Sequence, residues 1–256
     1  MRTTALALAG LLGSTVAWAD CEHERVIDKT LDVASADQLR IVAGAGDLEI
    51  RGEAGRDDVR VIGTICASKE EWAAESDVDT QEGRNALVAV VMPDVDWNMS
   101  WTGKRYVYID LDVRVPQSLA LDIMDSSGDI EIDGTGSLTL KDSSGDIEIE
   151  DVAGVISLED SSGDIDIIDL DGDLVVEHDS SGDLYGRGVT GSVLVKKDSS
   201  GDIRFKEVDQ DVIVERDSSG SIIADAVGGD FRVLKDGSGD IRHSNVAGEV
   251  QLPDKG

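Results

Sequence analysis

The segment "MDSSGDIEID" at residues 124–133 recurs almost unchanged as "KDSSGDIEIE" at residues 141–150. Aligned on the core Asp-Ser/Gly-Ser-Gly, seven consecutive units follow one another at intervals of 17 to 19 residues, and they begin at Asp125, Asp142, Asp160, Asp179, Asp198, Asp217 and Asp236. Such regular repetition indicates a solenoid, in which each unit is one coil and buries its apolar face only against its neighbours.

Apolar residues within each unit lie two positions apart, in two short groups. In "DSSGDIRFKEVDQDVIVER", residues 198–216, Ile203 and Phe205 form one pair, Val212 and Val214 form the other, and Val208 lies between them. This alternation places one set of side chains on one face of a strand. Equivalent strands of successive coils are expected to pair in parallel, about 4.8 Å apart.

We therefore predict an all-β fold, a single-stranded parallel β-helix or β-solenoid with about 19 residues per coil. Helical repeats are an alternative, but these units are too short for two helices and are rich in Gly, Asp, Ser, Val and Ile. A two-sheet sandwich is a second alternative, which the regular spacing and the identical turns disfavour.

The Asp-Ser-Ser-Gly core is expected to form a corner of each coil. Asp and Ser side chains accept hydrogen bonds from nearby backbone amides, and Gly admits a positive φ. Stacked corners would then place the serines in ladders, where their hydroxyls can bond from coil to coil.

The region before the repeats is less regular. Residues 20–115 are predicted to form a β-rich N-terminal cap with one short helix, and residues 116–256 the solenoid of seven repeats. "AGAGDLEIRG" at 43–52 matches the core of the repeat, and Ser68 with Glu71 has the spacing of a helix capping box. The cap would cover one open edge of the solenoid. Only Pro253 and a charged tail blunt the other edge, so the sequence leaves end-to-end self-association open.

The first residues have the pattern of a secretory signal peptide. Residues 1–19 contain Arg2, an apolar run over 5–12, and Ala17-Trp18-Ala19, which fits the small-x-small cleavage rule. The apolar run is shorter than the roughly 20 residues that cross a bilayer, and Asp20 disfavours lipidation of the following cysteine. We expect export to the periplasm, the cell surface or the extracellular space, with no membrane span.

Two cysteines, Cys21 and Cys66, remain after this segment. In an oxidising compartment a disulfide between them is expected, because structural zinc needs about four ligands; two free thiols are the alternative.

The formal net charge of −31 excludes nucleic acid and anionic membranes as favoured partners, since both attract positive proteins. A protein or a glycan partner stays open.

Several of these features occur together in one known family. A cysteine just after the signal, "GAGDLEI" at 44–50, a second cysteine at position 66 and serial "DSSGDI" coils resemble a bacterial family of secreted "putative adhesins" of unknown function, which is similar to the head-GIN β-helical domain. The resemblance implies a right-handed parallel β-helix. It implies no catalytic residues.

The repeated aspartates are the first candidate site. Neighbouring charges about 4.8 Å apart repel by about 0.9 kcal/mol in water and about 3.5 kcal/mol at an effective dielectric constant of 20. Backbone hydrogen bonds, raised pKa values or bound cations must relieve this repulsion.

Carboxylates and hydroxyls suit Ca²⁺, although no nonapeptide repeat or EF-hand loop is present; the alternative is that each aspartate caps its own turn in solvent. The candidate calcium ligands are Asp125, Asp129, Asp142, Asp146, Asp160, Asp164, Asp179, Asp183, Asp198 and Asp202.

An aromatic cluster is the second candidate site. Aromatic faces stack on sugar rings, so a glycan site is conceivable; a hydrophobic plug on the end of the solenoid is the alternative. The cluster comprises Trp97, Trp101, Tyr106 and Tyr108.

Catalysis has no support in the sequence. The three histidines, His23, His178 and His243, are scattered, and no G-x-S-x-G motif occurs. We predict no catalytic residues and no cofactor other than calcium. The expected function is that of a non-enzymatic, secreted or periplasmic structural or adhesin-like interaction module. A calcium-dependent or glycan-binding surface protein is the alternative, and a polysaccharide-processing β-helix enzyme is a more distant one.

Overall fold

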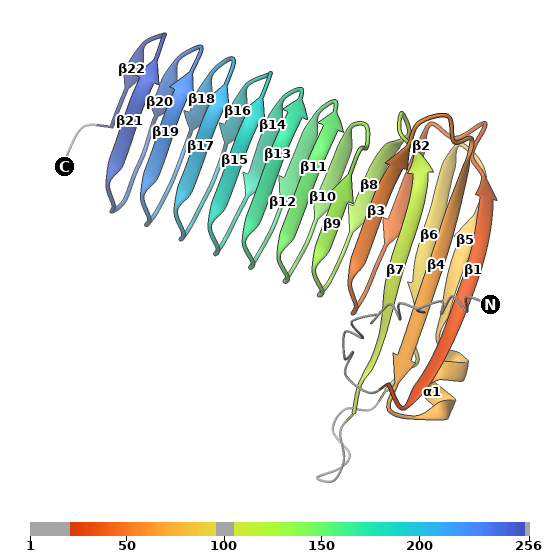
Figure 1. Ribbon diagram of the computed structural model, residues 1–256. Coiled ribbons are helices and arrows are strands. Elements are labelled where there is room, and N and C mark those ends of the chain that lie inside the picture. The colour runs from red at the N-terminus through yellow and green to blue at the C-terminus, as the bar shows by residue number, and fades with distance from the viewer. Residues whose placement is uncertain (1–20, 96–104, 254–256) are drawn as a thin grey trace, which may run out of the picture.

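The computed structural model describes residues 21–95 and 105–253, and these form a parallel β-solenoid with an antiparallel layer at its N-terminal end (Figure 1). Two sheets make the walls. Sheet A contains, in spatial order, β1 (His23–Asp32), β4 (Asp58–Ala67), β7 (Val107–Pro116), β3 (Leu48–Glu53), β9 (Ile130–Asp133), β11 (Ile147–Ala153), β13 (Ile165–Asp171), β15 (Leu184–Val189), β17 (Ile203–Val208), β19 (Ile222–Val227) and β21 (Ile241–Val246).

Sheet B faces it and contains, in spatial order from the same end, β5 (Asp77–Gln81), β6 (Asn85–Val91), β2 (Gln38–Val42), β8 (Ala120–Met124), β10 (Leu138–Lys141), β12 (Ile156–Glu159), β14 (Leu174–His178), β16 (Val193–Val195), β18 (Val212–Val214), β20 (Phe231–Val233) and β22 (Val250–Gln251). The one helix of the described residues, α1, spans Glu70–Glu75. No helix in these residues is both long and apolar enough to span a membrane.

Parallel pairing of equivalent positions confirms the predicted solenoid. Ile147 of β11 pairs with Ile130 of β9 on one side and with Ile165 of β13 on the other, and the same register continues to β21. Alternation along each strand then stacks apolar side chains inside and polar ones outside.

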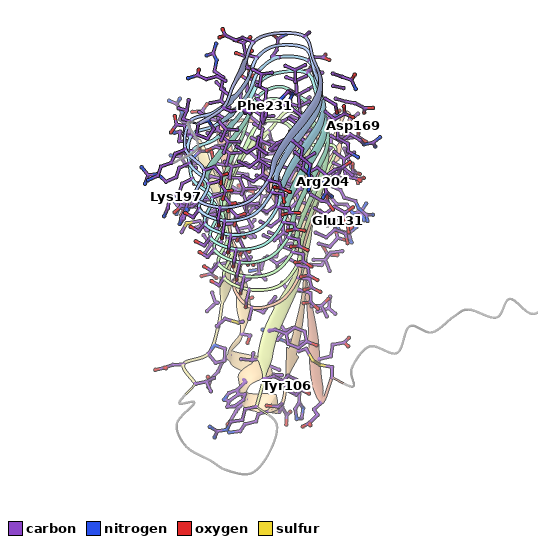
Figure 2. The ribbon with its side chains drawn as sticks, turned by 90° about the vertical axis from the view of Figure 1, so that its left-hand side faces the viewer. Tyr106, Glu131, Asp169, Lys197, Arg204 and Phe231 are labelled. Atoms are coloured by element: carbon purple, nitrogen blue, oxygen red, sulfur yellow. A yellow bond between two sulfur atoms is a disulfide. The ribbon has the colours of Figure 1, made fainter. Side chains whose placement is uncertain are left out.

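The core lies between the two sheets. The predicted inward residues of 198–216 are all buried: Ile203, Phe205, Val208, Val212 and Val214 are each at most 1 % exposed. Figure 2, seen from the C-terminal end, shows Phe231 inside the coil, with Glu131 and Arg204 on its outside.

The Asp-Ser-Ser-Gly corner depends on glycine. Gly163 has a φ of 138°, and a Cβ there would lie 1.7 Å from the carbonyl oxygen of Gly145. The serine ladder is also present, since the Ser162 hydroxyl donates to the carbonyl of Ser143 at 3.2 Å. The hydroxyls therefore bond to backbone carbonyls of the preceding coil.

A second corner, between the two strands of each coil, requires one left-handed residue. Gly134 and Gly188 fill this position in two coils, with φ of 67° and 72°. Other coils use residues that bear a Cβ, at a conformational cost of about 1 kcal/mol each; these are Asp151, Asp169, Glu207, Ala226 and Asn245.

The solenoid begins before the seven repeats. Strands β2 and β3 form a complete coil, in which Ala45 bridges Ser127 of the next coil. The chain then leaves this coil, builds β4 to β7, and returns at β8. Strands β1, β4 and β7 pair antiparallel, as do β5 and β6, and they cover the N-terminal end.

The short helix is confirmed, but the predicted capping box is wrong. The residue that precedes α1 is Lys69, and no side chain caps the N-terminus of the helix. Ser68 is engaged elsewhere, because its Oγ accepts a hydrogen bond from the amide of Tyr106 at 3.2 Å.

Candidate functional site

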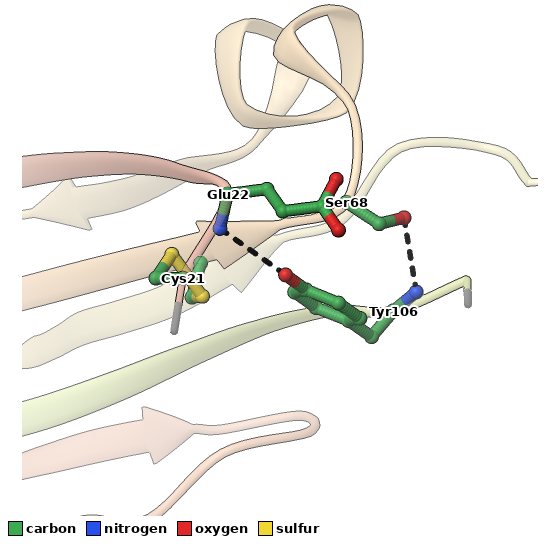
Figure 3. Close-up of a disulfide and its surroundings, with 5 residues drawn as sticks. Cys21, Glu22, Ser68 and Tyr106 are labelled. Carbon is green, nitrogen blue, oxygen red and sulfur yellow. Dashed lines mark hydrogen bonds between the residues drawn. A yellow bond between two sulfur atoms is a disulfide. The ribbon is translucent and has the colours of Figure 1, made fainter. Parts of the chain in front are cut away.

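The predicted disulfide is present, with Cα atoms of Cys21 and Cys66 5.7 Å apart. It fixes the start of β1 against the end of β4 (Figure 3). Beside it, the Glu22 amide donates to the hydroxyl of Tyr106 at 3.2 Å, and the Tyr106 amide donates to Ser68. A disulfide of this kind is typical of an oxidising compartment.

The aromatic cluster is only partly described. The rings of Tyr106 and Tyr108 lie 6.2 Å apart at the N-terminal end of the molecule, whereas Trp97 and Trp101 lie outside the described residues. Burial raises the pKa of Tyr108, and the nearby charge of Asp110 adds to that effect. Since Tyr106 joins β1 to β7 near the disulfide, its position has a structural explanation, and the glycan site stays a prediction.

The structure separates the predicted calcium ligands into two columns. Asp125, Asp142, Asp160, Asp179 and Asp198, the first residues of their repeats, point inward and are at most 7 % exposed. The fifth residues lie on the outside of the same corner and are exposed or partly exposed; they are Asp129, Asp146, Asp164, Asp183 and Asp202.

The outer column is a continuous hydrogen-bonded series. The amide of Asp146 donates to Oδ1 of Asp129 at 3.1 Å, and the amide of Asp164 donates to Oδ1 of Asp146 at 2.9 Å. The series starts before the repeats, at Asp110 and Asp47, and ends where the Ser221 amide donates to Asp202. Each outer carboxylate therefore caps the next coil, which corrects the alternative that every aspartate caps its own turn.

The inner column, as we call it from here on, consists of Asp125, Asp142, Asp160, Asp179, Asp198 and Asp217. Every coil repeats one backbone contact: the amide of Asp142 donates to the carbonyl of Glu159 at 2.9 Å, and that of Asp160 donates to the carbonyl of His178 at 2.8 Å. Repetition of this bond stacks the carboxyl groups directly above one another. Two members also cap their own turns, because the amides of Ser181 and Ser219 donate to Asp179 and Asp217.

Burial dominates the electrostatics of the inner column. It raises the pKa of Asp125, Asp179 and Asp198 to about 7 and that of Asp160 to about 6. The negative charges of neighbouring members act in the same direction. The carboxyls of Asp125 and Asp142 are within hydrogen-bonding reach of each other, as are those of Asp198 and Asp217.

Metal ligation has no geometric support in either column. Across residues 21–95 and 105–253, no three His, Cys, Asp or Glu side chains converge as a set that would hold a metal ion. The structure thus assigns no metal ligands, and calcium binding is a prediction of the sequence alone.

The sequence did not predict a groove on the outer face of sheet A. Its volume is about 740 Å³, and ten carboxylates line it together with Ile62 and Thr64 of β4. One side is the outer column, from Asp110 to Asp164. The other is a row of outward residues on adjacent strands, namely Asp112, Glu49, Glu131, Glu148 and Asp166.

Few cations neutralise the groove. Arg51 contacts Glu49 and also lies 3.8 Å from Glu131, and Arg114 lies 3.4 Å from Asp112. Within the described residues, Glu148 and Asp166 have no ion pair. Burial raises the pKa of Asp110 and of Asp166, and the negative charges of Asp47 and Asp164, respectively, act in the same direction.

The same row changes its charge toward the C-terminal end. Beyond Asp166 it continues through Tyr185, Arg204, Ile223 and Arg242. The acidic part of this row is therefore confined to β7, β3, β9, β11 and β13.

Three solved structures from Parabacteroides distasonis and Clostridium sporogenes are similar to the chain. A "putative adhesin" from Parabacteroides distasonis matches with a TM-score of 0.45 at 14 % identity, over 89 % of this chain and 97 % of its own. A "putative lipid binding protein" from the same species matches with 0.44 at 16 % identity, over 89 % and 96 %. A "putative cell adhesion protein" from Clostridium sporogenes matches with 0.31 at 11 % identity, over 91 % and 100 %.

No protein-family model and no curated protein matches the chain. At such low identities and TM-scores, the names of the similar structures carry no functional argument. The function must be argued from the residues of this solenoid, and above all from its acidic groove.

Proposed function

We propose that this chain is an exported, non-enzymatic β-solenoid that serves as a structural or adhesin-like interaction module, and that its acidic groove binds a positively charged segment of a partner protein. The observation that carries this proposal is the groove itself, which ten carboxylates line together with the side chain of Ile62. A cationic partner would relieve the repulsion between these carboxylates, and complementary charge also speeds association.

The chemistry of the groove favours an extended basic segment over a compact ligand. Its carboxylates stand in two parallel lines along the stacking direction, one on the corner and one on the face of sheet A. Lysine or arginine side chains of one extended chain can reach both lines. Export agrees with the disulfide between Cys21 and Cys66.

Binding of a poly-lysine peptide, followed by fluorescence anisotropy at low and at physiological salt, tests the proposal. A triple variant, Glu131→Gln, Glu148→Gln and Asp166→Asn, removes three charges from the groove. A control variant, Asp122→Asn, Glu159→Gln and Glu177→Gln, removes three charges from the outer face of sheet B.

The groove variant should weaken binding at least about tenfold, since charged contacts that are lost each contribute on the order of 0.5–1 kcal/mol. The control variant should bind within about twofold of the wild type. Equal weakening by both variants would mean that net charge alone attracts the peptide, and the proposed groove would be wrong.

A second interaction surface is the C-terminal end. Strands β21 and β22 each pair on one side only within the described residues. The inward positions Ile241, Val246 and Val250 are only partly buried there, and Leu252 is 41 % exposed. An open edge of this kind pairs readily with another chain, so we include end-to-end self-association in the proposal.

A further inference from the structure

The inner column is a stack of carboxyl groups that are buried next to one another. Asp160 and Asp179 are fully buried and Asp198 is 1 % exposed. The amides of the following serines, Ser161 and Ser199, act on Asp160 and Asp198 from the turn. Within the described residues, however, no carboxyl oxygen of Asp160 or of Asp198 accepts a hydrogen bond of normal geometry. Several stacked, unpaired negative charges in this position would cost more than a folded domain can tolerate.

Among the described residues, no cationic side chain faces the column. On the sheet B side, the residues that precede its members lie outward; they are Met124, Lys141, Glu159, His178, Lys197 and Arg216. Lys141 pairs with Glu159, and His178 contacts the Ser180 hydroxyl. On the turn side, amides of the following serines and the charge of Asp164 act on the column. Asp236 acts on it at the C-terminal end. At the N-terminal end, the stacking position is held by Ala43, whose amide donates to the carbonyl of Met124.

We propose that the inner column is a proton-binding site, in which carboxylic acids donate hydrogen bonds to neighbouring carboxylates and the folded solenoid holds protons that the unfolded chain releases at neutral pH. The protons come from solvent and return to it on unfolding. Asp142 is placed to accept from both of its neighbours, Asp125 and Asp160, so one shared proton on each side satisfies oxygens that otherwise lack a donor.

The sign of the pH dependence follows from burial. Burial raises the pKa of these carboxyls above that of an exposed aspartate, with values of about 6 to about 7 for Asp160 and Asp179. A group whose pKa is raised on folding stabilises the fold below its unfolded pKa, and this contribution disappears as the pH rises through the folded pKa. The solenoid should therefore lose stability between about pH 4 and pH 7.

Urea unfolding at pH 5 and pH 8 tests the proposal. The wild type should unfold at lower urea concentration at pH 8. In Asp160→Asn/Asp198→Asn, a neutral side chain of the same shape replaces each acid. Its unfolding equilibrium constant at pH 8 should fall by about tenfold or more per site relative to the wild type, and the difference between pH 5 and pH 8 should shrink.

A matched control separates the inner column from general charge repulsion. Asp146→Asn/Asp183→Asn removes the same number of charges from the outer column, where an amide oxygen still accepts the bond from the next coil. This control should keep the wild-type pH dependence. If it reduces that dependence as much as the inner variant does, or if the wild type is equally stable at both pH values, the proposal is overturned.

Two further measurements cover cation binding by the column and an inner variant that does not fold. If Ca²⁺ at pH 8 stabilises the wild type and the inner variant abolishes that gain, the column holds cations and the proposal is wrong. If the inner variant does not fold, carboxyl ¹³C resonances of the wild-type protein give the answer. Native-state titration of column aspartates near pH 6–7 supports the proposal, and titration of every aspartate near its ordinary pKa overturns it.

Discussion

The amide of Asp164 donates to Oδ1 of Asp146 at 2.9 Å, across two successive coils. One residue of the repeat thus holds the first turn of the next coil, and the same bond recurs from Asp47 to Ser221. A hydrogen bond encoded in the repeat itself therefore helps to set how successive coils stack.

This relationship predicts different effects of two substitutions at Asp146. Asp146→Ala removes the acceptor and should lower the free energy of unfolding by about 1–2 kcal/mol. Asp146→Asn keeps an acceptor oxygen and removes one negative charge, so its free energy of unfolding should stay within about 0.5 kcal/mol of the wild type. Urea denaturation at neutral pH measures both. Equal losses in the two variants would show that the charge, and not the hydrogen bond, matters.

Thr135 offers a stabilising change. It is fully buried, and its hydroxyl has no hydrogen-bond partner within the described residues. Val152 follows the left-handed residue of the next coil as Thr135 follows Gly134, and it is 2 % exposed. Thr135→Val should raise the free energy of unfolding by about 1 kcal/mol, because it removes a buried unsatisfied group while keeping the branched shape. A loss of stability would point to a hidden partner for the hydroxyl.

The open C-terminal end predicts self-association that depends on concentration. Sedimentation velocity should detect a dimer or a longer species as the protein concentration rises. Val250→Lys/Leu252→Lys places one charge in the edge strand β22 and one directly after it, and should restore the monomer. A wild type that is strictly monomeric at high concentration would contradict end-to-end association, and so would a variant that associates as strongly as the wild type.

Period-two alternation was sufficient to predict the solenoid and its inward residues. Pairs such as Ile203 with Phe205 lie where the sequence places them, because one unit can bury its apolar face only against another. The disulfide followed from the count of cysteines. The capping box failed because Ser68 has a competing partner in Tyr106, which is distant in sequence.

The inner column could have been predicted from the same period-two alternation. Leu138 and Leu140 point inward, and one further step of two reaches Asp142. Aspartate commonly accepts backbone hydrogen bonds in exposed turns, and burying its charge is costly. The sequence therefore favours an exposed turn position for Asp142. In the longer units, an extra residue near His178 shifts the register and hides the alternation that ends on Asp179.

The groove could not be predicted, because its walls come from strands that are adjacent only in the fold. Asp112 of β7 lies beside Glu49 of β3, and Glu49 lies beside Glu131 of β9. The chain reaches this arrangement by leaving the solenoid after one coil and returning several strands later. No local pattern in the sequence indicates which strand borders the first coil.

The most direct test of the central claim is the location of a bound basic segment. A poly-lysine peptide is bound at low salt, coupled to nearby carboxylates by a zero-length carbodiimide, and mapped by mass spectrometry. The account predicts that Glu131, Glu148 and Asp166 carry most of the cross-links and that physiological salt reduces them. Cross-links spread evenly over both sheets, or concentrated on Glu159 and Glu177 of sheet B, would contradict it.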